Sequence, residues 1–431
     1  MIRIHDFRDD HPDFLSLLER GAMPDPKVVA AVAEIVESVR TGGDEALFHH
    51  MKRLDGVDLA ATGPRVSDAD IDAAHRAMPT PLLEAIDAAC LNLRRYHERQ
   101  LPADYRIDGP DGEILERRYR PIATVGVCVP GATAPLLSSL YMNLVPALVA
   151  GVPRLVVISA PRNGRVDPAI LATAAHLGVR EIYAISGAQG VAALAYGTKS
   201  VPKVDKVVGP GSIWVSTAKR LVYGVVGIDS IAGPSEIAII ADATASPRNI
   251  AIDLLSQAEH GTGQEASVAF VPTRSQAESV RDELNRLARK YDLASAVKPA
   301  LDRHGALFVV NNLNDAVSAV NKLAPEHVEL LGPEAEGLAD RLVNFGALFL
   351  GEQTPEPVGD YYAGTNHVLP TQGTARFASG LTVADFLRSS SRVRYTSESL
   401  ARAGDHIRNL AEAEHMRAHR LAVELRLHPE S

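Results

Sequence analysis

The spacing of hydrophobic positions changes along the chain. From about residue 25 to residue 100, apolar residues recur at three- and four-residue intervals, as in VVAAVAEIVESV and LLEAIDAACLNL. This spacing predicts helices, with breaks at Gly42-Gly43 and at Pro79 to Pro81. After Pro121, short apolar runs alternate with amphipathic segments, in the order ATVGVCV, LLSSLYMNLVPALVAG, RLVVIS and AILATAAHLG. Strands that alternate with helices over short connections predict a parallel sheet covered on both faces.

A second series of the same kind begins near Glu236. Its segments are IAIIA, NIAIDLLSQAEH, ASVAFV, SQAESVRDELNRLARK, ALFVV, NDAVSAVNKLA and ALFL. We therefore expect an α/β protein with two tandem Rossmann-like, doubly wound domains, an N-terminal helical region and a C-terminal helical arm. The expected boundaries are 1–120 for the helical region, packed on the second α/β unit, 121–234 and 235–381 for the two domains, and 382–431 for the arm.

The predicted helix of the arm is polar and rich in arginine but carries an apolar stripe, formed by Leu400, Ile407, Leu410 and Met416. Such a stripe is typical of a helix that packs against another surface. Periodicity alone does not decide whether that surface belongs to the same chain or to a second copy.

Composition narrows the classes of function. The 431 residues include 44 lysines and arginines against 53 aspartates and glutamates, a formal net charge of −9, without a block of like charges. The basic footprint of a nucleic-acid or anionic-membrane binder is missing, and we expect neither partner. No apolar run approaches the ~20 residues of a membrane span, and the first residues lack a signal-peptide pattern. We therefore expect a cytoplasmic protein.

Two cysteines are too few for a disulfide scaffold or a cysteine-based zinc site, so a metal would need histidine, carboxylate or amide ligands. Gln257 and His260 stand three residues apart on a predicted helix and project from one face. In the arm, Glu414, His415 and His419 are expected on one helix, where the two histidines could form a metal pair at i,i+4 spacing. The sequence does not decide between that pair and a site that only His419 enters.

Further candidates lie at the ends of predicted elements. Glu326 and His327, in APEHVEL, stand at the start of a predicted strand, where neighbouring side chains point to opposite sides. We expect them to serve one substrate from different directions without forming a hydrogen-bonded pair. Asp360 lies in VGDYYAGTNHVLP, a polar loop of the kind that carries function.

Two Gly/Pro turns follow predicted strands of the first unit, Val129-Pro130-Gly131 and Gly209-Pro210-Gly211. Ligands bind outside the carboxyl ends of strands in such sheets, and a helix amino terminus there can hold a phosphate. The G-x-G-x-x-G fingerprint of many dinucleotide sites is absent, as are H-E-x-x-H and G-x-S-x-G.

Eight motifs, taken together, resemble the histidinol dehydrogenase family. In chain order they are VGVCVPGATAP, ISGAQGVAALAYGT, PKVDKVVGPGS, GIDSIAGPSE, DLLSQAEHG, APEHVEL, VGDYYAGTNHVLPT and AEAEHMRAHRLAVELR. Their order and spacing match the family from about Val28 to Arg426. The resemblance implies a zinc-dependent, NAD-linked, four-electron oxidation of L-histidinol through the aldehyde to L-histidine. This is the last step of histidine biosynthesis, and the family implies an intertwined homodimer.

The resemblance also assigns roles to residues of this sequence. It implies zinc ligands from one chain and one ligand from the partner subunit's arm, namely Gln257, His260, Asp360 and His419. It implies acid/base roles for Glu326 and His327, and none for His415. The implied substrate-binding residues are Ser235, Gln257, His260, His327, Asp360, Glu414 and His419. The implied nucleotide-side residues are Cys128, Gln189 and Ser212.

The chemistry agrees with these roles. A histidine of near-neutral pKa suits removal of the carbinol proton as hydride leaves. A carboxylate such as Glu326 suits activation of the water that hydrates the aldehyde. Zinc bound by one amide, two imidazoles and one carboxylate can still accept nitrogen ligands from a substrate, and so would orient it more than activate it.

Four positions depart from the residues usual in the family, and all lie in the segment expected near the nucleotide: Cys128 for Tyr, Ala132 for Gly, Lys199 for Glu and Ser212 for Asn. They leave open a paralogue that handles the cofactor differently or oxidises another amino alcohol or polyol. A third alternative is a catalytically silent zinc-binding dimer, against which the intact Glu326 and His327 argue.

Overall fold

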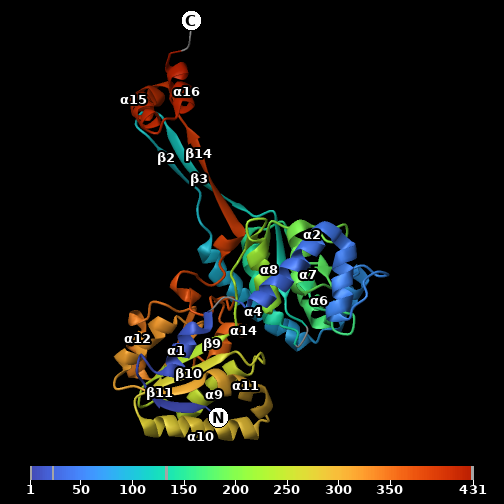
Figure 1. Cartoon of the computed structure of the whole chain (residues 1–431), viewed down its shortest axis with the longest axis vertical. Helices are drawn as coiled ribbons and strands as arrows, with labels where there is room; N and C mark the ends of the chain where they lie inside the picture. The colour runs from blue at the N-terminus through green and yellow to red at the C-terminus, as the bar shows by residue number, and fades with distance from the viewer. Residues whose placement is uncertain (1, 22–23, 132–133, 429–431) are drawn as a thin grey trace.

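Two parallel sheets form the body of the molecule, and a slender arm projects from it (Figure 1). The computed structural model describes residues 2–21, 24–131 and 134–428. The first sheet has the strand order β6-β5-β4-β7-β8, and the second has the order β1-β11-β10-β9-β12-β13. Counted from β4 and from β9, both follow the order 3-2-1-4-5 of a doubly wound Rossmann-like unit. The expected fold class is confirmed.

The first unit surrounds its sheet with helices on both faces. Its strands are β4 (Thr124–Val129), β5 (Arg154–Ser159), β6 (Ile182–Tyr183), β7 (Lys206–Val208) and β8 (Gly227–Ile228). Its helices are α5 (Leu137–Ala150), α6 (Pro168–His176), α7 (Gly187–Tyr196) and α8 (Ile213–Val222). Helices α5 and α7 are apolar on nearly every side because each is enclosed between the sheet and further helices.

The second unit repeats this plan. Its strands are β9 (Glu236–Ala241), β10 (Ala266–Val271), β11 (Gly305–Val309), β12 (His327–Leu331) and β13 (Ala347–Leu350). Its helices are α9 (Pro247–Ala258), α10 (Arg274–Lys290), α11 (Ala294–His304), α12 (Leu313–Leu323), α13 (Pro333–Glu336) and α14 (Glu356–Tyr361). Alternate residues of β12 pack on opposite faces: Val328 and Leu330 lie in the core beside α12, and Leu331 in the core beside α9.

The N-terminal region does not pack as expected. β1 (Arg3–Asp6), α1 (Pro12–Leu18) and the short turn that follows α1 join the second unit, where β1 pairs with β11 and Arg20 forms an ion pair with Glu236. Helices α2 (Pro26–Asp55), α3 (Asp68–Ala77) and α4 (Thr80–His97) cover the first unit instead. The apolar stripe of α2 fits into the core beside α7, and Gly43 kinks this helix at the predicted break. The prediction that this region packs on the second unit is therefore wrong for α2, α3 and α4, and holds for β1 and α1.

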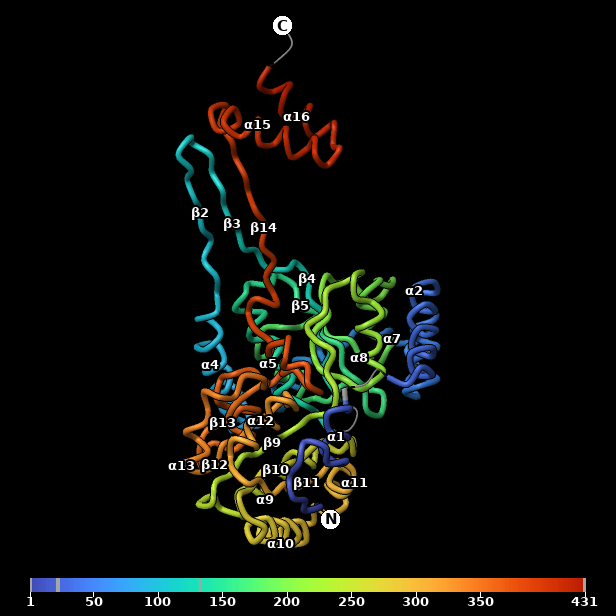
Figure 2. Tube along the Cα trace, turned by 60° about the vertical axis from the view of Figure 1, so that its left-hand side comes forward, coloured from blue at the N-terminus to red at the C-terminus, as the bar shows by residue number. Residues whose placement is uncertain are grey.

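The arm is built from strands as well as helices (Figure 2). β2 (Tyr105–Asp108) and β14 (Leu387–Arg394) flank β3 (Ile114–Pro121) in an antiparallel sheet that carries α15 (Ser397–Ala413) and α16 (Arg417–Leu427) at its tip. Neither the region 1–120 nor the region 382–431 is thus wholly helical. In the described part of the chain, no helix combines the length and apolar character that crossing a bilayer requires.

Candidate active site

The candidate catalytic residues gather at the amino-terminal edge of the second sheet. Glu326 and Ser235 directly precede the neighbouring strands β12 and β9. Helices of a parallel α/β unit run antiparallel to its strands, so their carboxyl ends reach the same edge. The end of α9 therefore delivers Gln257 and His260, and α14 adds Asp360. The site thus lies opposite the carboxyl-terminal edge, where such sheets ordinarily bind ligands.

Glu326 is buried beside the first residues of β9. Its Oε2 accepts the backbone N–H of Glu236 at 3.1 Å, and the Ser235 hydroxyl also donates to this carboxyl group. Burial raises the pKa of Glu326 well above its usual value, and the negative charges of Asp360 and Glu236 add to the shift. A carboxyl group with a raised pKa can exchange protons with a substrate near neutral pH.

His327 is almost fully buried, and its hydrogen bonds define its tautomer. Its Nδ1 lies 3.1 Å from two acceptors, the Glu236 carbonyl and the Gln257 Oε1, and therefore carries the ring proton. Burial lowers the pKa of His327 to about 4, so the ring is neutral and Nε2 has a free lone pair. Nδ1 lies 3.9 Å from Glu326 Oε2, too far for a hydrogen bond, as the extended backbone predicts.

Gln257 and His260 do not share one helix as the sequence predicts, because α9 ends at Ala258 and His260 lies in the following turn. The His260 Nδ1 lies 3.1 Å from the Gln257 carbonyl oxygen, to which it donates. This leaves the His260 Nε2 for a ligand, and histidines that bind metals are oriented in this way. The amide oxygen of Gln257 has two lone pairs, so it can keep His327 as a partner and still bind a cation.

The sequence reasoning overlooked two residues of this cluster, Glu356 and His367. Glu356 Oε1 lies 4.0 Å and Asp360 Oδ1 lies 3.9 Å from His327 Nε2, and His367 Nδ1 lies 3.7 Å from the same Asp360 oxygen. Both overlooked residues flank Asp360 in one polar segment, Glu356 one helical turn before it. Their closeness to Asp360 in the sequence is the signal by which they could have been predicted.

The two carboxyl groups of α14 have opposite protonation. Burial and then the negative charge of Asp360 raise the pKa of Glu356 to about 10. For Asp360, burial acts to raise the pKa, but His367, His327 and a hydrogen bond from Glu356 outweigh it, and the pKa is lowered. Asp360 is therefore the anion, and Glu356 holds a proton directed toward it.

These residues fit a divalent cation. Ligand atoms of His327, Glu356 and Asp360 lie within 4.8 Å of one another. In the described residues, the buried atoms His327 Nε2, Glu356 Oε1 and Gln257 Nε2 have no hydrogen-bond partner. An anionic carboxylate beside imidazole and amide donors is a donor set that suits zinc. This fit supports a metal beside Asp360.

The two arm residues expected at the site lie far from it in this chain. Glu414 directly follows α15 and His419 lies in α16, both solvent-exposed at the tip of the arm (Figure 1). The single helix predicted for Glu414, His415 and His419 is wrong, because the chain turns between α15 and α16 with φ +59° at His415. The i,i+4 geometry of the alternative histidine pair is thereby lost.

The nucleotide-side residues of the first unit have varied surroundings. Cys128 is buried in β4, and burial raises the pKa of its thiol to about 12. Gln189 is buried in α7 and donates to Asp55 of α2 at 2.8 Å. Ser212 precedes α8 and is exposed, as is Lys199. Ala132 lies outside the described residues.

The turn Gly209-Pro210-Gly211, between β7 and α8, is held through both backbone polar groups of Gly209. Asp229 accepts the Gly209 N–H at 2.7 Å, and Lys219 donates to the Gly209 carbonyl at 3.0 Å. Lys219 and Asp229 are themselves a buried ion pair. Gly209 has φ +102°, and a Cβ there would lie 2.2 Å from the Cys128 carbonyl oxygen. Only glycine therefore allows this close approach of the turn to β4.

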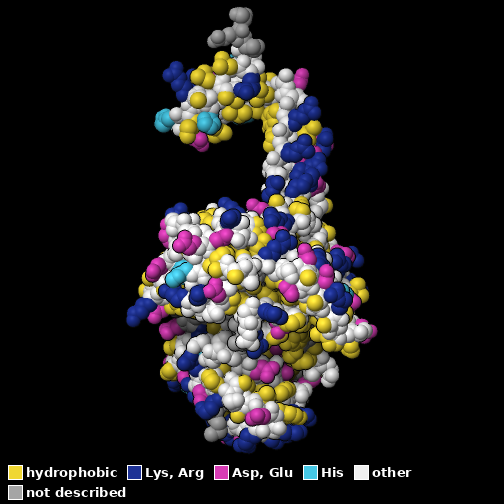
Figure 3. Space-filling model, turned by 90° about the vertical axis from the view of Figure 1, so that its right-hand side faces the viewer, with side chains coloured by type: hydrophobic (Ala, Val, Ile, Leu, Met, Phe, Trp, Pro, Cys, Tyr) yellow, Lys and Arg dark blue, Asp and Glu magenta, His cyan; other side chains and the backbone are white. Residues whose placement is uncertain are grey.

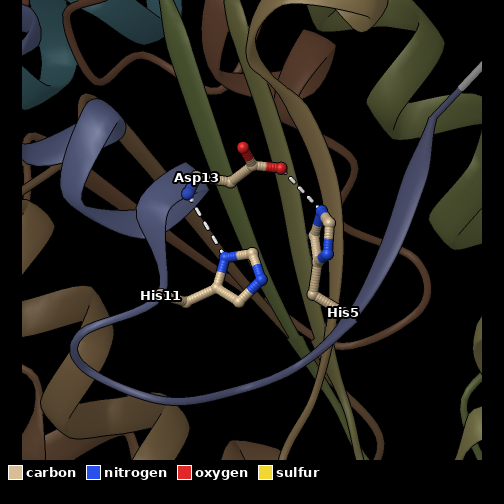
Figure 4. A group of neighbouring side chains, drawn as sticks. All are labelled: His5, His11 and Asp13. Carbon is tan, nitrogen blue, oxygen red and sulfur yellow. Dashed lines mark hydrogen bonds and ion pairs between the residues drawn. The ribbon is translucent and has the colours of Figure 1, made fainter.

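A second group of metal-competent side chains in the described residues, His5, His11 and Asp13, lies near the N-terminus (Figure 4). His5 Nε2 lies 2.6 Å and Arg3 Nη1 lies 3.1 Å from Asp13 Oδ2. The Nδ1 of His11 accepts the Asp13 backbone N–H and caps α1. Because Arg3 already balances the carboxylate and the His11 nitrogen is engaged, this group fastens β1 to α1.

The fold and the site together define a class: an enzyme of two Rossmann-like units with a buried, metal-competent acid/base cluster on the second. Comparison with known proteins identifies the family within this class. The family model for histidinol dehydrogenase matches residues 18–427. The histidinol dehydrogenase of Halalkalibacterium halodurans is 46% identical over 401 residues, which are 93% of this chain and 94% of that protein.

A Bacillus cereus histidinol dehydrogenase is 43% identical over 430 residues, 100% of this chain and 99% of that protein. The crystal structure of histidinol dehydrogenase from Elizabethkingia anophelis matches with a TM-score of 0.91 at 32% identity, over 99% of this chain and 98% of that one. The chain belongs to the histidinol dehydrogenase family. It is accordingly an NAD-dependent dehydrogenase.

Proposed function

We propose that this enzyme oxidises L-histidinol to L-histidine through L-histidinaldehyde, with zinc bound and two molecules of NAD reduced. The observation that supports this most is the buried cluster in which an unprotonated His327 Nε2 lies 3.9 Å from the Asp360 carboxylate. Relatives that carry the name histidinol dehydrogenase span nearly the whole chain. A cytoplasmic location is part of the proposal, and both cysteines are free.

In this proposal Gln257, His260 and Asp360 hold the zinc together with the partner subunit's His419. When bound, the zinc supplies a positive charge and ligand positions for the amine and imidazole nitrogens of the substrate. The partner subunit's Glu414 and this chain's Ser235 contribute further substrate contacts. NAD binds to the first unit, on the side of Cys128, Gln189 and Ser212.

His327 acts as the base for the alcohol. Its Nε2 takes the carbinol proton while the carbon–hydrogen bond breaks and its electron pair leaves as hydride to NAD. Water then adds to the aldehyde: Glu326 takes a proton from that water, and His327 returns its proton to the carbonyl oxygen, which leaves its Nε2 free again. A second hydride leaves the hydrate to a second NAD, and its hydroxyl proton is lost to His327. The two hydrides account for the four electrons.

The decisive experiment is formation of NADH by the full-length, zinc-loaded protein with L-histidinol at saturating NAD. We expect about two NADH per histidinol consumed, because each hydride transfer reduces one NAD. His327→Asn is the matched control, since it keeps the size of the side chain but removes the base. NADH formation from another amino alcohol or polyol and none from histidinol would contradict the proposed substrate and identify a paralogue.

A further inference from the structure

Two further buried carboxyl groups, those of Asp253 and Glu329, lie on the same elements as the site residues. Asp253 stands four residues before Gln257 on α9, and Glu329 stands two residues after His327 on β12. Side chains four apart on a helix, or two apart on a strand, point to the same side. The carboxyl groups of Asp253 and Glu329 therefore point to the same side as Gln257 and His327. They lie farther from the amino-terminal edge of the sheet.

Glu329 joins three elements at once. It is fully buried, and its Oε1 accepts the backbone N–H of Glu356, the first residue of α14, at 2.8 Å. Burial raises the pKa of Glu329 well above its usual value, so this carboxyl group keeps its proton and donates it in a hydrogen bond to Asp253 of α9. One side chain of β12 thus links the helix that carries Gln257 with the helix that carries Asp360.

Two carboxyl groups in contact are an unusual way to fill an interior. Asp253 is 6% and Glu329 is 0% exposed, and burial of such groups is costly unless each is hydrogen-bonded. Apolar side chains would fill the same space without that cost. Carboxyl groups differ from apolar groups in forming directional hydrogen bonds, and each such bond fixes how two elements lie relative to each other.

We propose that Asp253 and Glu329 are a positioning pair, which sets α9, β12 and α14 at the spacing that the zinc ligands and the base require. The pair touches neither substrate nor metal. This inference rests on the proposed function for what is positioned: Gln257 and Asp360 as ligands, and His327 as the base. Outer partners of ligating residues typically change metal affinity or activity by ~10- to 100-fold when removed.

The test compares disrupting, conservative and control variants of the full-length protein. Glu329→Leu removes both hydrogen bonds, and Asp253→Ala removes one. Glu329→Gln is the conservative variant, because its amide oxygen accepts the Glu356 N–H and its amide nitrogen donates to Asp253.

Asp242→Leu is the matched control. Asp242 is a buried carboxylate that follows β9, and its Oδ2 accepts the N–H of Glu334, in the first turn of α13, at 2.8 Å. It thus resembles Glu329 in burial and in its bond to a helix amino terminus. It differs in lying at the opposite edge of the same sheet, away from the site.

The first measurement is zinc affinity, by competition with a chelator. We expect Glu329→Leu and Asp253→Ala to lose ~10- to 100-fold, while Glu329→Gln and Asp242→Leu stay close to the unsubstituted protein. The second measurement is hydrogen exchange, which needs no metal. We expect faster exchange at residues 356–361 in the two disrupting variants, and at residues 333–336 in Asp242→Leu.

Unchanged zinc affinity and unchanged exchange of α14 in a folded disrupting variant would overturn the proposal. Equal loss of zinc affinity in Asp242→Leu would overturn it as well, since the effect would then be general destabilisation. If Glu329→Leu does not fold, the zinc affinity and the hydrogen exchange of Asp253→Ala decide whether the proposal holds. If the unsubstituted protein binds no zinc and does not oxidise histidinol, the proposed function fails, and the exchange pattern alone decides whether the pair positions α14.

Discussion

Burial gives the side chains at the start of β12 properties that their residue types do not have in water. Burial raises the pKa of Glu326 and lowers the pKa of His327, because removal from water disfavours the charged form of either group. The backbone carbonyl of Glu236 then fixes the proton of His327 on Nδ1. The two neighbours are thereby suited to different proton transfers.

The two catalytic substitutions should separate the two oxidations. We expect Glu326→Gln to slow the aldehyde-to-acid step more than the alcohol step, because only the former needs activated water. His327→Asn should slow both steps by ~10²- to 10⁴-fold, the usual effect of losing a positioned base. Histidinol and the aldehyde are assayed separately at saturating NAD. Equal slowing of both steps in Glu326→Gln would show that the residues act as one unit.

His304, at the end of α11, should make stability depend on pH. Burial, together with Arg20, Arg303 and Arg3, lowers its pKa to about 4 from 6.5. As the pH falls, His304 therefore binds a proton in the unfolded chain at a higher pH than in the folded protein. Its contribution to stability is complete above pH 6.5 and is lost as the pH falls toward 4. Because the ring is partly exposed, we expect a loss of ~1–2 kcal/mol.

The measurement is the free energy of unfolding in urea at pH 7 and near pH 4.5. The unsubstituted protein should lose more stability between these values than His304→Gln, which has no group that titrates there. An identical pH dependence for the two proteins would show that His304 is not held neutral by the fold.

At the scale of elements, the end of α15 decides which arm histidine can reach a metal. With φ +59° at His415, the chain changes direction before α16 begins at Arg417. We expect His415→Ala to leave the zinc content unchanged and His419→Ala to lower it. Elemental analysis of the purified proteins gives the answer. Equal losses in both variants would revive the histidine pair as the ligand set.

The turn at Gly209 should tolerate no side chain. Ala at this position meets both a left-handed backbone, which costs ~1–2 kcal/mol, and the Cys128 carbonyl, an overlap that costs a further ~1–3 kcal/mol. Gly224→Ala is the matched control, with φ +99° and no atom within 4 Å of the added Cβ. We expect Gly209→Ala to be the less stable in urea unfolding and to bind NAD more weakly. Equal effects would show that the contact with β4 is unimportant.

At the scale of the whole molecule, the arm has the features of an exchanged element. Leu400 and Ile407 are partly covered within the arm, but Leu410 and Met416 remain 65% and 47% exposed. Hydrophobic side chains accordingly gather over the arm helices in the space-filling view (Figure 3). An exposed apolar patch on a projecting element favours docking on a second copy.

Mixing two inactive variants tests this exchange. A chain with His327→Asn has an unaltered arm, and a chain with His419→Ala has an unaltered body. If each site combines the body of one chain with the arm of the other, one of the two sites in every mixed dimer is intact. Dissociating and reassociating equal amounts should then restore about a quarter of the unsubstituted activity. Recovery of no activity, despite formation of mixed dimers, would show that each arm serves its own chain.

Truncation after Arg394 gives an independent check, because β14 ends there and only α15 and α16 are lost. We expect the body to remain folded and the protein to be monomeric in light scattering and inactive in NADH formation. A monomeric and fully active product would contradict the arm's role.

The sequence by itself determined the elements that depend on local pattern. The alternation of apolar runs and amphipathic segments specified both Rossmann-like units, and Gly42-Gly43 marked the kink in α2, because periodicity and backbone freedom act over a few residues. The same pattern left the packing of α2 to α4 open, since an apolar stripe states that a helix is buried but not against which sheet. The motifs likewise identified the family.

Only the tertiary structure decided which groups face one another. Glu356 and Asp360 come to face His327, and Asp253 comes to face Glu329, once three elements separated in the sequence meet at one edge of the second sheet. The protonation of His327 and Glu326 depends on that meeting too, because a pKa responds to all charges and dipoles within a few ångströms. Local spacing cannot encode such distances. They arise from the packing of the whole chain.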